Sequence, residues 1–207
     1  MHPNPIFHTA SDLENLEFAR HRAFGMLTVN GPEGPLAAHV PFILSKDGSL
    51  AELHLVRSNP IVRALAQPLP ALIAVTGPDS YVSPDWYGID DQVPTWNYQA
   101  VHLRGRLERR PDSELAALLE RQSAIYEGRL LPKAPWRLDK MSEPARAKLL
   151  RMIVPCRMRI TGVDGTWKLS QNKADAVRLA AADGVEAHGF GAGTGSLADQ
   201  MRAAKGA

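Results

Sequence analysis

Short runs of alternating apolar and polar residues, separated by turn residues, dominate the first half of the chain. Strands are predicted over residues 24–29, 36–44 and 51–56. Asn30-Gly31-Pro32 and Asp47-Gly48 lie between them and are typical hairpin turns. Further strands are predicted over 70–77, 99–110, 152–163 and 166–173. Hairpin-linked strands of this number predict an antiparallel sheet that closes into a small barrel.

Helical periodicity is confined to shorter segments. Ser11 and Glu14 form a capping-box pattern at the start of a helix over 11–21. Further helices are predicted over 61–67, 112–127, 143–150 and 174–182. The predicted fold is therefore mainly β with peripheral helices (α+β), built on six or seven antiparallel strands. A single domain is expected over 1–185 with a helical insert over 112–150, followed by a flexible C-terminal tail over 186–207.

Composition places the chain among ordinary cytoplasmic proteins. No apolar run reaches the 18 or so residues of a membrane span, so no membrane partner is expected. The N-terminus lacks the basic start and apolar core of a secretion signal. The single cysteine, Cys156, cannot form an internal disulfide, and its apolar surroundings are typical of an inert buried thiol.

Charge is distributed unevenly although the net charge is only +2. Residues 1–100 hold 5 Lys and Arg against 10 Asp and Glu, whereas residues 101–168 hold 15 against 8. A basic middle segment of this kind is usually a solvated face, and it also suits an acidic partner or DNA. Charge therefore leaves DNA open as a partner.

Aromatic residues gather between Tyr81 and Tyr98. Trp86, Tyr87 and Trp96 lie between those two, although aromatic residues are scarce in the chain as a whole. Two interpretations remain open: a surface that binds something flat, or side chains that fill a small barrel. Further along the same stretch, Gly105 within a strand predicts a bulge or a close approach of two backbones.

The segment Arg57-Ser58-Asn59-Pro60 follows the third strand and precedes a helix. Ser58 or Asn59 suits the N-cap, and Pro60 suits the first helical position. Free backbone N–H groups and the helix dipole make such a junction a plausible phosphate site, and a simple capped helix is the alternative.

Strong catalytic motifs are missing. No metalloprotease, C-x-x-C, nucleophile-elbow or P-loop pattern is present, and no metal site is predicted. His39, His54 and His102 lie on different predicted strands and leave haem ligation as a weaker alternative. Asp85, Asp90 and Asp91 lie in a turn, where acids are common in any case. A phosphate site and an aromatic cluster together favour a flat ring that carries a phosphate, of which flavin mononucleotide (FMN) is the commonest example.

The motifs GPDSYVSPDWYG and VPTWNYQAVHLRGRLE resemble those of the PaiB family, described as FMN-binding negative transcriptional regulators. GMLTVN, HVPF, ELHLVRSNP and VDGTWKLSQNK are similar to that family in the same order, so that the resemblance covers about residues 1–185. It implies a split β-barrel of the pyridoxamine-phosphate-oxidase type, built as a homodimer with FMN between subunits.

The resemblance also implies which residues bind the cofactor. The phosphate would be held at Arg57, Ser58 and Asn59, and the ring would lie near the second strand and near the VPTWNY motif. The expected cofactor-binding residues are His39, Val40, Pro41, Phe42, His54, Arg57, Ser58, Asn59, Trp96, Asn97, Tyr98, Lys168, Gln171 and Asn172. Of these, Lys168, Gln171 and Asn172 are expected to reach across from the partner chain.

Two functions follow. The first is an FMN-binding, repressor-like transcriptional regulator that acts on DNA as a homodimer, directly or through another protein. The second is an FMN-dependent oxidoreductase of the pyridoxamine-phosphate-oxidase or flavin-reductase type. No residue is assigned to catalysis, and no helix-turn-helix pattern is visible.

Overall fold

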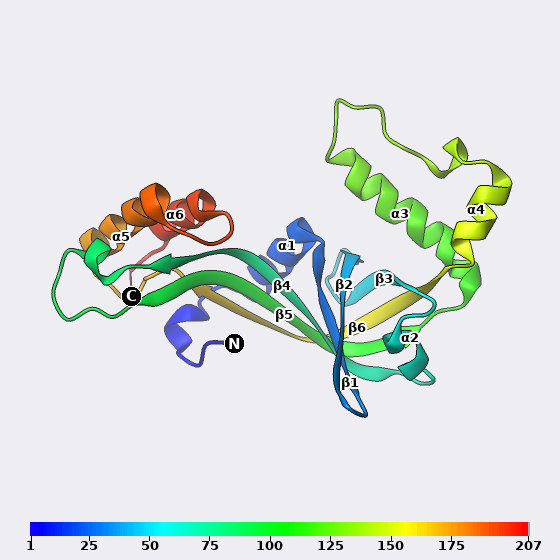
Figure 1. Ribbon diagram of the computed structural model, residues 1–207, viewed down its shortest axis with the longest axis horizontal. Coiled ribbons are helices and arrows are strands. Elements are labelled where there is room, and N and C mark those ends of the chain that lie inside the picture. The colour runs from blue at the N-terminus through cyan, green and yellow to red at the C-terminus, as the bar shows by residue number, and fades with distance from the viewer. Residues whose placement is uncertain (207) are drawn as a thin grey trace. The chain divides into compact units, whose positions relative to one another are not determined.

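The computed structural model describes residues 1–206 and divides into two compact units (Figure 1). Unit 1 comprises Met1–Arg22, Val75–His102 and the chain from Val163 onward, and unit 2 comprises Ala23–Ala74 and Leu103–Gly162. Three of the boundaries between the units, at 74/75, 102/103 and 162/163, fall within residues that form strands. A single domain over 1–185 stays a prediction.

Residues 1–206 contain six strands, and the prediction of six or seven antiparallel strands is confirmed. They are β1 (Phe24–Gly31), β2 (Gly34–Leu44), β3 (Leu50–Val56), β4 (Leu69–Val82), β5 (Thr95–Arg109) and β6 (Ile153–Lys168). They close into a barrel in the order β1-β2-β3-β6-β5-β4. The strand predicted over 152–163 and the start of the one predicted over 166–173 form one continuous strand, β6, because the Asp164-Gly165 pair between them stays extended. The prediction of a strand is wrong for residues 169–173, which form a bend and a turn.

Helices form at the predicted places and at one further place. They are α1 (Asp12–Arg22), α2 (Pro60–Ala64), α3 (Leu115–Gly128), α4 (Glu143–Leu150), α5 (Asp175–His188) and α6 (Thr194–Ala203). Single 3-10 turns are η1 (Pro5–Phe7), η2 (Pro84–Tyr87), η3 (Asp112–Glu114) and η4 (Leu138–Lys140). None of the helices in residues 1–206 is long and apolar enough to cross a bilayer.

Strand alternation produces the interior of the barrel in unit 2. Leu27 of β1, Phe42 of β2 and Leu53 of β3 are completely buried, and so are Leu103 and Leu107 of β5. Their neighbours in sequence are exposed or half-buried, as a period of two requires, except Ile43, which is also buried. These apolar side chains fill the barrel, so its interior is a packed core.

Gly105 allows β5 and β6 to approach closely. A Cβ atom at this position would lie 2.1 Å from the carbonyl oxygen of Arg159, a separation that no real side chain tolerates. The predicted close approach of two backbones is therefore confirmed.

The capping box predicted at the start of α1 is present. The Glu14 carboxylate accepts hydrogen bonds from the Ser11 backbone N–H and hydroxyl, both at 2.7 Å, and the Glu14 N–H donates to the Ser11 hydroxyl at 3.3 Å. These contacts satisfy N–H groups that the first helical turn leaves without partners. They also lower the pKa of Glu14.

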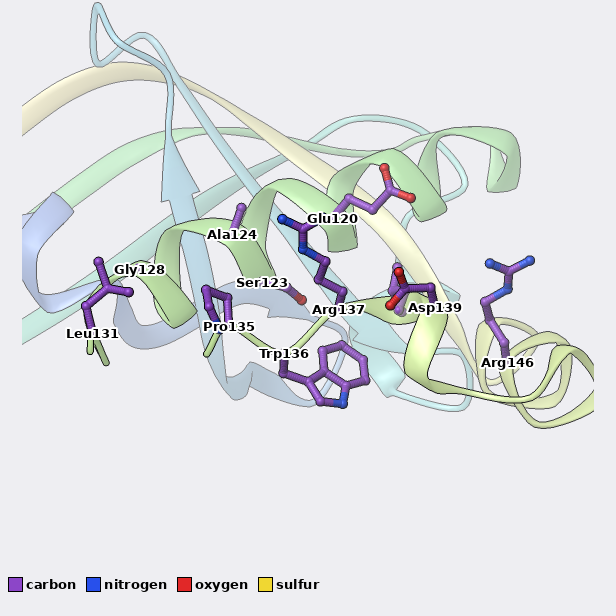
Figure 2. Close-up of a pocket in the computed structure, with 11 residues that line it drawn as sticks. Glu120, Ser123, Ala124, Gly128, Leu131, Pro135, Trp136, Arg137, Asp139 and Arg146 are labelled. Carbon is purple, nitrogen blue, oxygen red and sulfur yellow. The ribbon is translucent and has the colours of Figure 1, made fainter. Parts of the chain in front are cut away.

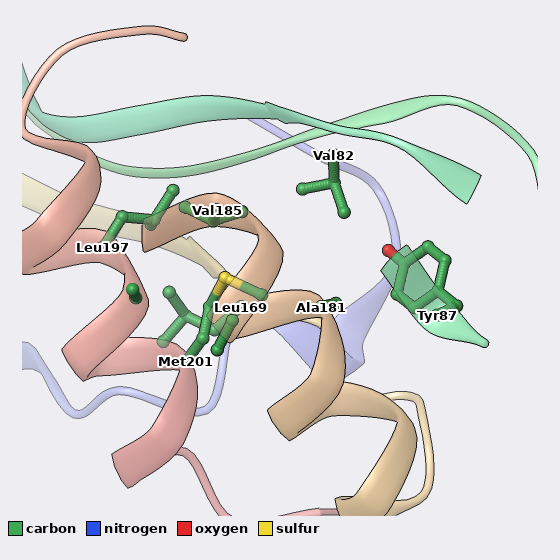
Figure 3. Packing of buried hydrophobic residues seen from close by; sticks show 9 residues of the cluster. Val82, Tyr87, Leu169, Ala181, Val185, Leu197 and Met201 are labelled. Carbon is green, nitrogen blue, oxygen red and sulfur yellow. The ribbon is translucent and has the colours of Figure 1, made fainter. Parts of the chain in front are cut away.

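The C-terminal segment contributes to the core of unit 1, and the predicted flexible tail over 186–207 is wrong for its helical part. Leu197, Ala198 and Met201 of α6 are completely buried and pack against Val185 of α5 and Val82 of β4 (Figure 3). Gly193, with φ of 67°, turns the chain from α5 into α6. Four glycines over 189–195 suggested a loop, but the first three form only the connection and Gly195 lies in the first turn of α6, whose apolar spacing went unrecognised.

Leu197 provides a test of this packing. We expect Leu197→Ala to lower the free energy of unfolding by about 2–5 kcal/mol, because it opens a cavity in the unit 1 core. Leu130→Ala, at a position that is 54% exposed, should change it by no more than about 0.5 kcal/mol. Urea denaturation of both variants measures the difference, and equal stability would contradict a packed C-terminal helix.

Candidate functional site

The predicted phosphate site in unit 2 is an N-capped helix. Asn59 accepts a hydrogen bond from the Ile61 N–H at 2.9 Å through its side-chain oxygen, and Pro60 is the first helical residue. The Arg57 guanidinium donates to the carbonyl oxygens of Arg151 and Ile153 and to Asp112 at 2.9–3.1 Å. Arg57 thus ties the end of β3 to the start of β6, and phosphate binding at residues 57–59 stays a prediction that would rely mainly on Ser58.

The predicted residues of β2 are split between the two faces of the strand. Val40 and Phe42 are 2% and 0% exposed and belong to the barrel core, so their side chains cannot contact a cofactor. His39 points outward and stacks on Phe24, with ring centroids 6.1 Å apart. Pro41 is half-buried opposite Phe24 in the β1–β2 register.

His54 of β3 is held by helix α3. Its Nδ1 lies 3.0 Å from the Oε1 atom of Gln122, which is itself buried. Burial lowers the pKa of His54, and the hydrogen bond to Gln122 opposes this shift. Gln122 also donates to the carbonyl oxygen of Glu52, so that it connects α3 to β3.

Alternation along β5 separates the predicted trio Trp96, Asn97 and Tyr98. Asn97 is completely buried in unit 1, whereas Trp96 is 44% exposed on the opposite face of the strand. Tyr98 is half-buried on the same face as Trp96, and burial raises its pKa. Only Asn97 of the three therefore faces the interior.

A polar pocket of about 220 Å³ in unit 1 brings together Asn97, Lys168 and Asn172. The Asn97 side-chain N–H donates to the Ser170 hydroxyl at 2.8 Å, and the Tyr87 hydroxyl lies 3.2 Å from the same oxygen. The Oδ1 atom of Asn97 is buried and has no hydrogen-bond partner within residues 1–206. An unpartnered buried carbonyl at a pocket wall is suited to an N–H or O–H group of a ligand.

Two ammonium groups give the pocket a positive character. Lys168 donates to the Thr95 hydroxyl, and burial lowers the pKa of its ammonium group. Lys173 donates to the side-chain oxygen of Gln92 and lies over the Tyr87 ring, 5.4 Å from its centroid. Each ammonium group carries three donors, so both retain N–H groups for an anion.

The chain matches the family model described as "Putative FMN-binding domain" over residues 1–162. It belongs to this family. The chain is also 30% identical over 172 residues to "Protease synthase and sporulation protein PAI 2" of Bacillus subtilis (strain 168), an alignment that covers 82% of each protein. The predicted family and the predicted cofactor, FMN, are thereby confirmed.

Solved structures confirm the fold. A FAD and heme binding protein from Mycobacterium smegmatis superposes with a TM-score of 0.57 at 17% identity, over 89% of this chain and 81% of that one. The flavocytochrome Anf3 from Azotobacter vinelandii gives 0.53 at 16% identity, over 76% and 68%. At such identities the likeness is evidence for the split-barrel fold alone.

Gln171, the remaining residue predicted to bind FMN, is engaged elsewhere in this member of the FMN-binding family. Its Oε1 atom accepts from the Leu169 N–H at 2.8 Å, and its N–H groups donate to the carbonyl oxygens of Trp167 and Ile6. All of these contacts are internal to unit 1. Gln171 therefore shapes the turn that presents Lys168 and Asn172.

Ser170, Lys173, Thr95 and Tyr87 were not predicted as site residues. Ser170 and Lys173 lie within the WKLSQNK motif, so the motif itself was the available signal. Ser170 has φ of 62°, and this left-handed turn directs both its hydroxyl and the Lys173 side chain to the pocket. Sequence spacing does not reveal such a turn at a non-glycine residue.

The aromatic stretch divides into a core residue and a surface cluster. Tyr87 is 4% exposed and packs within the unit 1 core. One of the two interpretations had expected such burial for all of the aromatic residues between Tyr81 and Tyr98. Tyr81 contacts the rings of Trp86, Trp96 and Phe190, with centroids 5.4–6.5 Å apart. Trp96 and Phe190 are 44% and 61% exposed, so this cluster retains a surface for a flat partner.

A larger cavity of about 500 Å³ lies in unit 2 between α3 and the segment 131–146. Trp136, Arg137 and Arg146 stand around it, opposite Glu120 and Ser123 of α3 (Figure 2). None of the predicted cofactor residues lines it.

Neither a metal centre nor a reactive thiol stands out in the described residues. Within residues 1–206, no group of three His, Cys, Asp or Glu side chains is placed to hold a metal ion. Cys156 is buried in the barrel, and burial raises the pKa of its thiol to about 12. The thiolate that would act as a nucleophile is therefore disfavoured.

The buried imidazole of His54 makes stability depend on pH. Its folded-state pKa lies below the unfolded value, so its contribution is present above about pH 6.5 and is lost as pH falls through the folded-state pKa. We expect the free energy of unfolding to fall between pH 7.5 and pH 5.0, and to fall less in His54→Gln, which cannot titrate. Urea denaturation at both pH values measures this, and an identical pH dependence in the variant would contradict it.

Proposed function

We propose that the protein is a cytoplasmic, repressor-like transcriptional regulator that binds FMN as a homodimer. Membership of the FMN-binding family carries the cofactor part of this proposal, and the polar pocket of unit 1 supports it. The regulatory part rests on the likeness to the PAI 2 protein, whose name associates that relative with protease synthesis and sporulation.

The pocket in unit 1 fits part of FMN. FMN has a phosphate and carbonyl oxygens that accept hydrogen bonds, and N–H and O–H groups that donate them. Lys168 and Lys173 would donate hydrogen bonds to the acceptors of FMN. The Oδ1 atom of Asn97, which has no partner within residues 1–206, would accept a hydrogen bond from one of its donors. Ligand pockets usually measure about 300–1,000 Å³, so a volume of about 220 Å³ suits one end of the cofactor.

Bound FMN supplies a planar ring that accepts and returns electrons. The residues of this chain would bind and orient it. Asn97 is fixed by Ser170, which is in turn held by Tyr87, so the acceptor atom is rigidly placed. Trp96 lies on the opposite face of β5 from Asn97, so its exposed ring and that of Phe190 offer a separate stacking surface for a flat group, outside this pocket.

The outer face of β1 and β2 in unit 2 supports a dimer. Phe24 and Met26 are 49% and 38% exposed, and they lie opposite Pro41 and His39 in the strand register. Exposed apolar side chains grouped in this way are typical of a protein interface. This face includes two residues that the resemblance assigns to FMN, His39 and Pro41, as expected of a cofactor bound between subunits.

The basic middle segment supports DNA binding only in part, because many of its arginines are neutralised. Arg109, Arg110, Arg121 and Arg157 form ion pairs with acidic residues of unit 2 at 2.8–3.5 Å. Arg137 before α4, Lys148 on α4 and Arg151 just after it make no ion pair with any residue that the structure describes. These side chains are the best candidates for contacts with DNA phosphates.

Lys168 tests the cofactor site. We expect Lys168→Met to weaken FMN binding about tenfold or more, because a hydrogen bond to a charged group contributes about 1.5–3 kcal/mol. Lys148→Met, the matched change on exposed α4, should leave the affinity unchanged. Titration by quenching of flavin fluorescence measures both. Equal affinity for FMN in the two variants would show that FMN does not bind in this pocket.

DNA binding should depend steeply on salt. In a mobility-shift titration with upstream DNA, we expect affinity to fall with rising salt, and Lys148→Ala combined with Arg151→Ala to reduce the slope of log K against log[salt] by about 2. The Lys168→Met variant serves as the control, since it should keep the wild-type slope. Absence of a shift at every salt concentration, together with bleaching of bound flavin by NADH or NADPH, would favour the oxidoreductase alternative.

A further inference from the structure

Gln99 of β5 carries a buried side-chain oxygen that has no partner in the part of the chain that the structure describes. Its side chain is 2% exposed, and its Oε1 atom has no hydrogen-bond partner within residues 1–206. Gln122 and Gln171, the other buried glutamines, have both ends of their amides bonded. Leaving a buried carbonyl unpaired is destabilising, so this exception calls for an explanation.

Gln99 lines a cavity of about 550 Å³ that lies entirely within unit 1. Gln200 of α6 lines the same cavity, and its Oε1 atom is a second buried acceptor without a partner among the described residues. The volume lies within the range of small-molecule pockets, about 300–1,000 Å³. None of the residues around it lines the pocket assigned to FMN.

Aromatic rings form one side of this cavity. Phe18 of α1 and Trp167 of β6 meet edge to face, with centroids 6.0 Å apart at 61°. The Trp167 indole N–H donates to the Asn15 side chain at 2.9 Å, so its single donor is already used. Gly77 keeps the adjoining space open, because a Cβ atom there would lie 2.8 Å from Phe18 and 3.1 Å from Gln99.

The remaining polar groups are mainly acceptors. Glu14 and Glu17 of α1 line the cavity, and Glu17 also pairs with Arg20 at 3.2 Å. The hydrogen bonds from Ser11 lower the pKa of Glu14, which keeps its carboxylate ionised. His21 and Arg22 contribute the positive or titratable groups, at the exposed end of α1. Two unpaired carbonyls, two carboxylates and two aromatic rings together match a cation that carries N–H donors on an apolar body.

We propose that this cavity binds a small organic amine, an ammonium group attached to an aromatic or apolar body. The N–H groups satisfy Gln99 and Gln200, and the apolar body packs on Phe18 and Trp167. This site is independent of the proposed cofactor and regulatory roles, since it uses none of their residues.

Benzylammonium is the probe, and full-length protein saturated with FMN and labelled with ¹⁵N-tryptophan is the target. We expect the indole resonance of Trp167, identified by its loss in Trp167→Phe, to shift in a saturable way. Benzyl alcohol, the neutral counterpart, should bind about tenfold or more weakly, and benzoate should not bind. No shift with benzylammonium, or an equal response to benzoate, would overturn the proposal.

A matched pair of variants separates binding from structure. Gln99→Met should keep or raise the Tm without ligand, because it removes an unpaired carbonyl, and should weaken benzylammonium binding about tenfold or more. Gln122→Met should lower the Tm, because it breaks the bonds to His54 and Glu52, and should leave the affinity unchanged. Gln200→Met serves as the second variant if Gln99→Met does not fold. Unchanged affinity for benzylammonium in a folded Gln99→Met or Gln200→Met variant would show that these amides do not bind the ligand. A decrease of Tm in Gln99→Met as large as that in Gln122→Met would show the same.

Discussion

Alternation along strand β5 is the constraint on which the rest of the structure depends. Asn97 and Gln99 point inward in unit 1, and Leu103 and Leu107 continue the same alternation into the barrel core of unit 2. A shift of one residue in register would exchange these side chains with the polar residues between them. The apolar end of the strand makes that shift very costly, and this holds the two amides at its other end in place.

Buried polar side chains in unit 1 fall into two kinds. Gln171 and Arg178 are bonded to nearby backbone groups and hold turns and helices together. Asn97 and Gln99 each keep a buried oxygen without a partner among residues 1–206, and each residue lines a pocket. Stability alone does not account for unpaired carbonyls, whereas a ligand that donates a hydrogen bond to each would. The two strongest candidate sites in this unit therefore rest on the same physical observation.

Charge in unit 2 shows why composition is a weak guide to partners. The excess of basic residues over 101–168 suggested an anionic partner, yet several of these arginines are paired with Glu52, Asp112 and Glu114. Arg57, predicted at the phosphate site, instead bonds to backbone carbonyls and Asp112. The pairs of Arg57 with Asp112, Arg121 with Glu52 and Arg157 with Glu52 join residues 55 to 105 positions apart, a distance at which sequence spacing carries no information.

The sequence by itself determined the strands, the hairpin turns, the cap of α1, the close approach at Gly105 and the family. Each of these depends on local backbone chemistry or on a contiguous motif. Only the tertiary structure decided which residues share a pocket. It separated Trp96 from Asn97 by strand alternation, assigned Gln171 to a turn, added Ser170 and Lys173 through a left-handed backbone conformation, and buried α6 in the core of unit 1. The physical reason is that hydrogen-bond partners and burial are set by long-range packing, which no local pattern encodes.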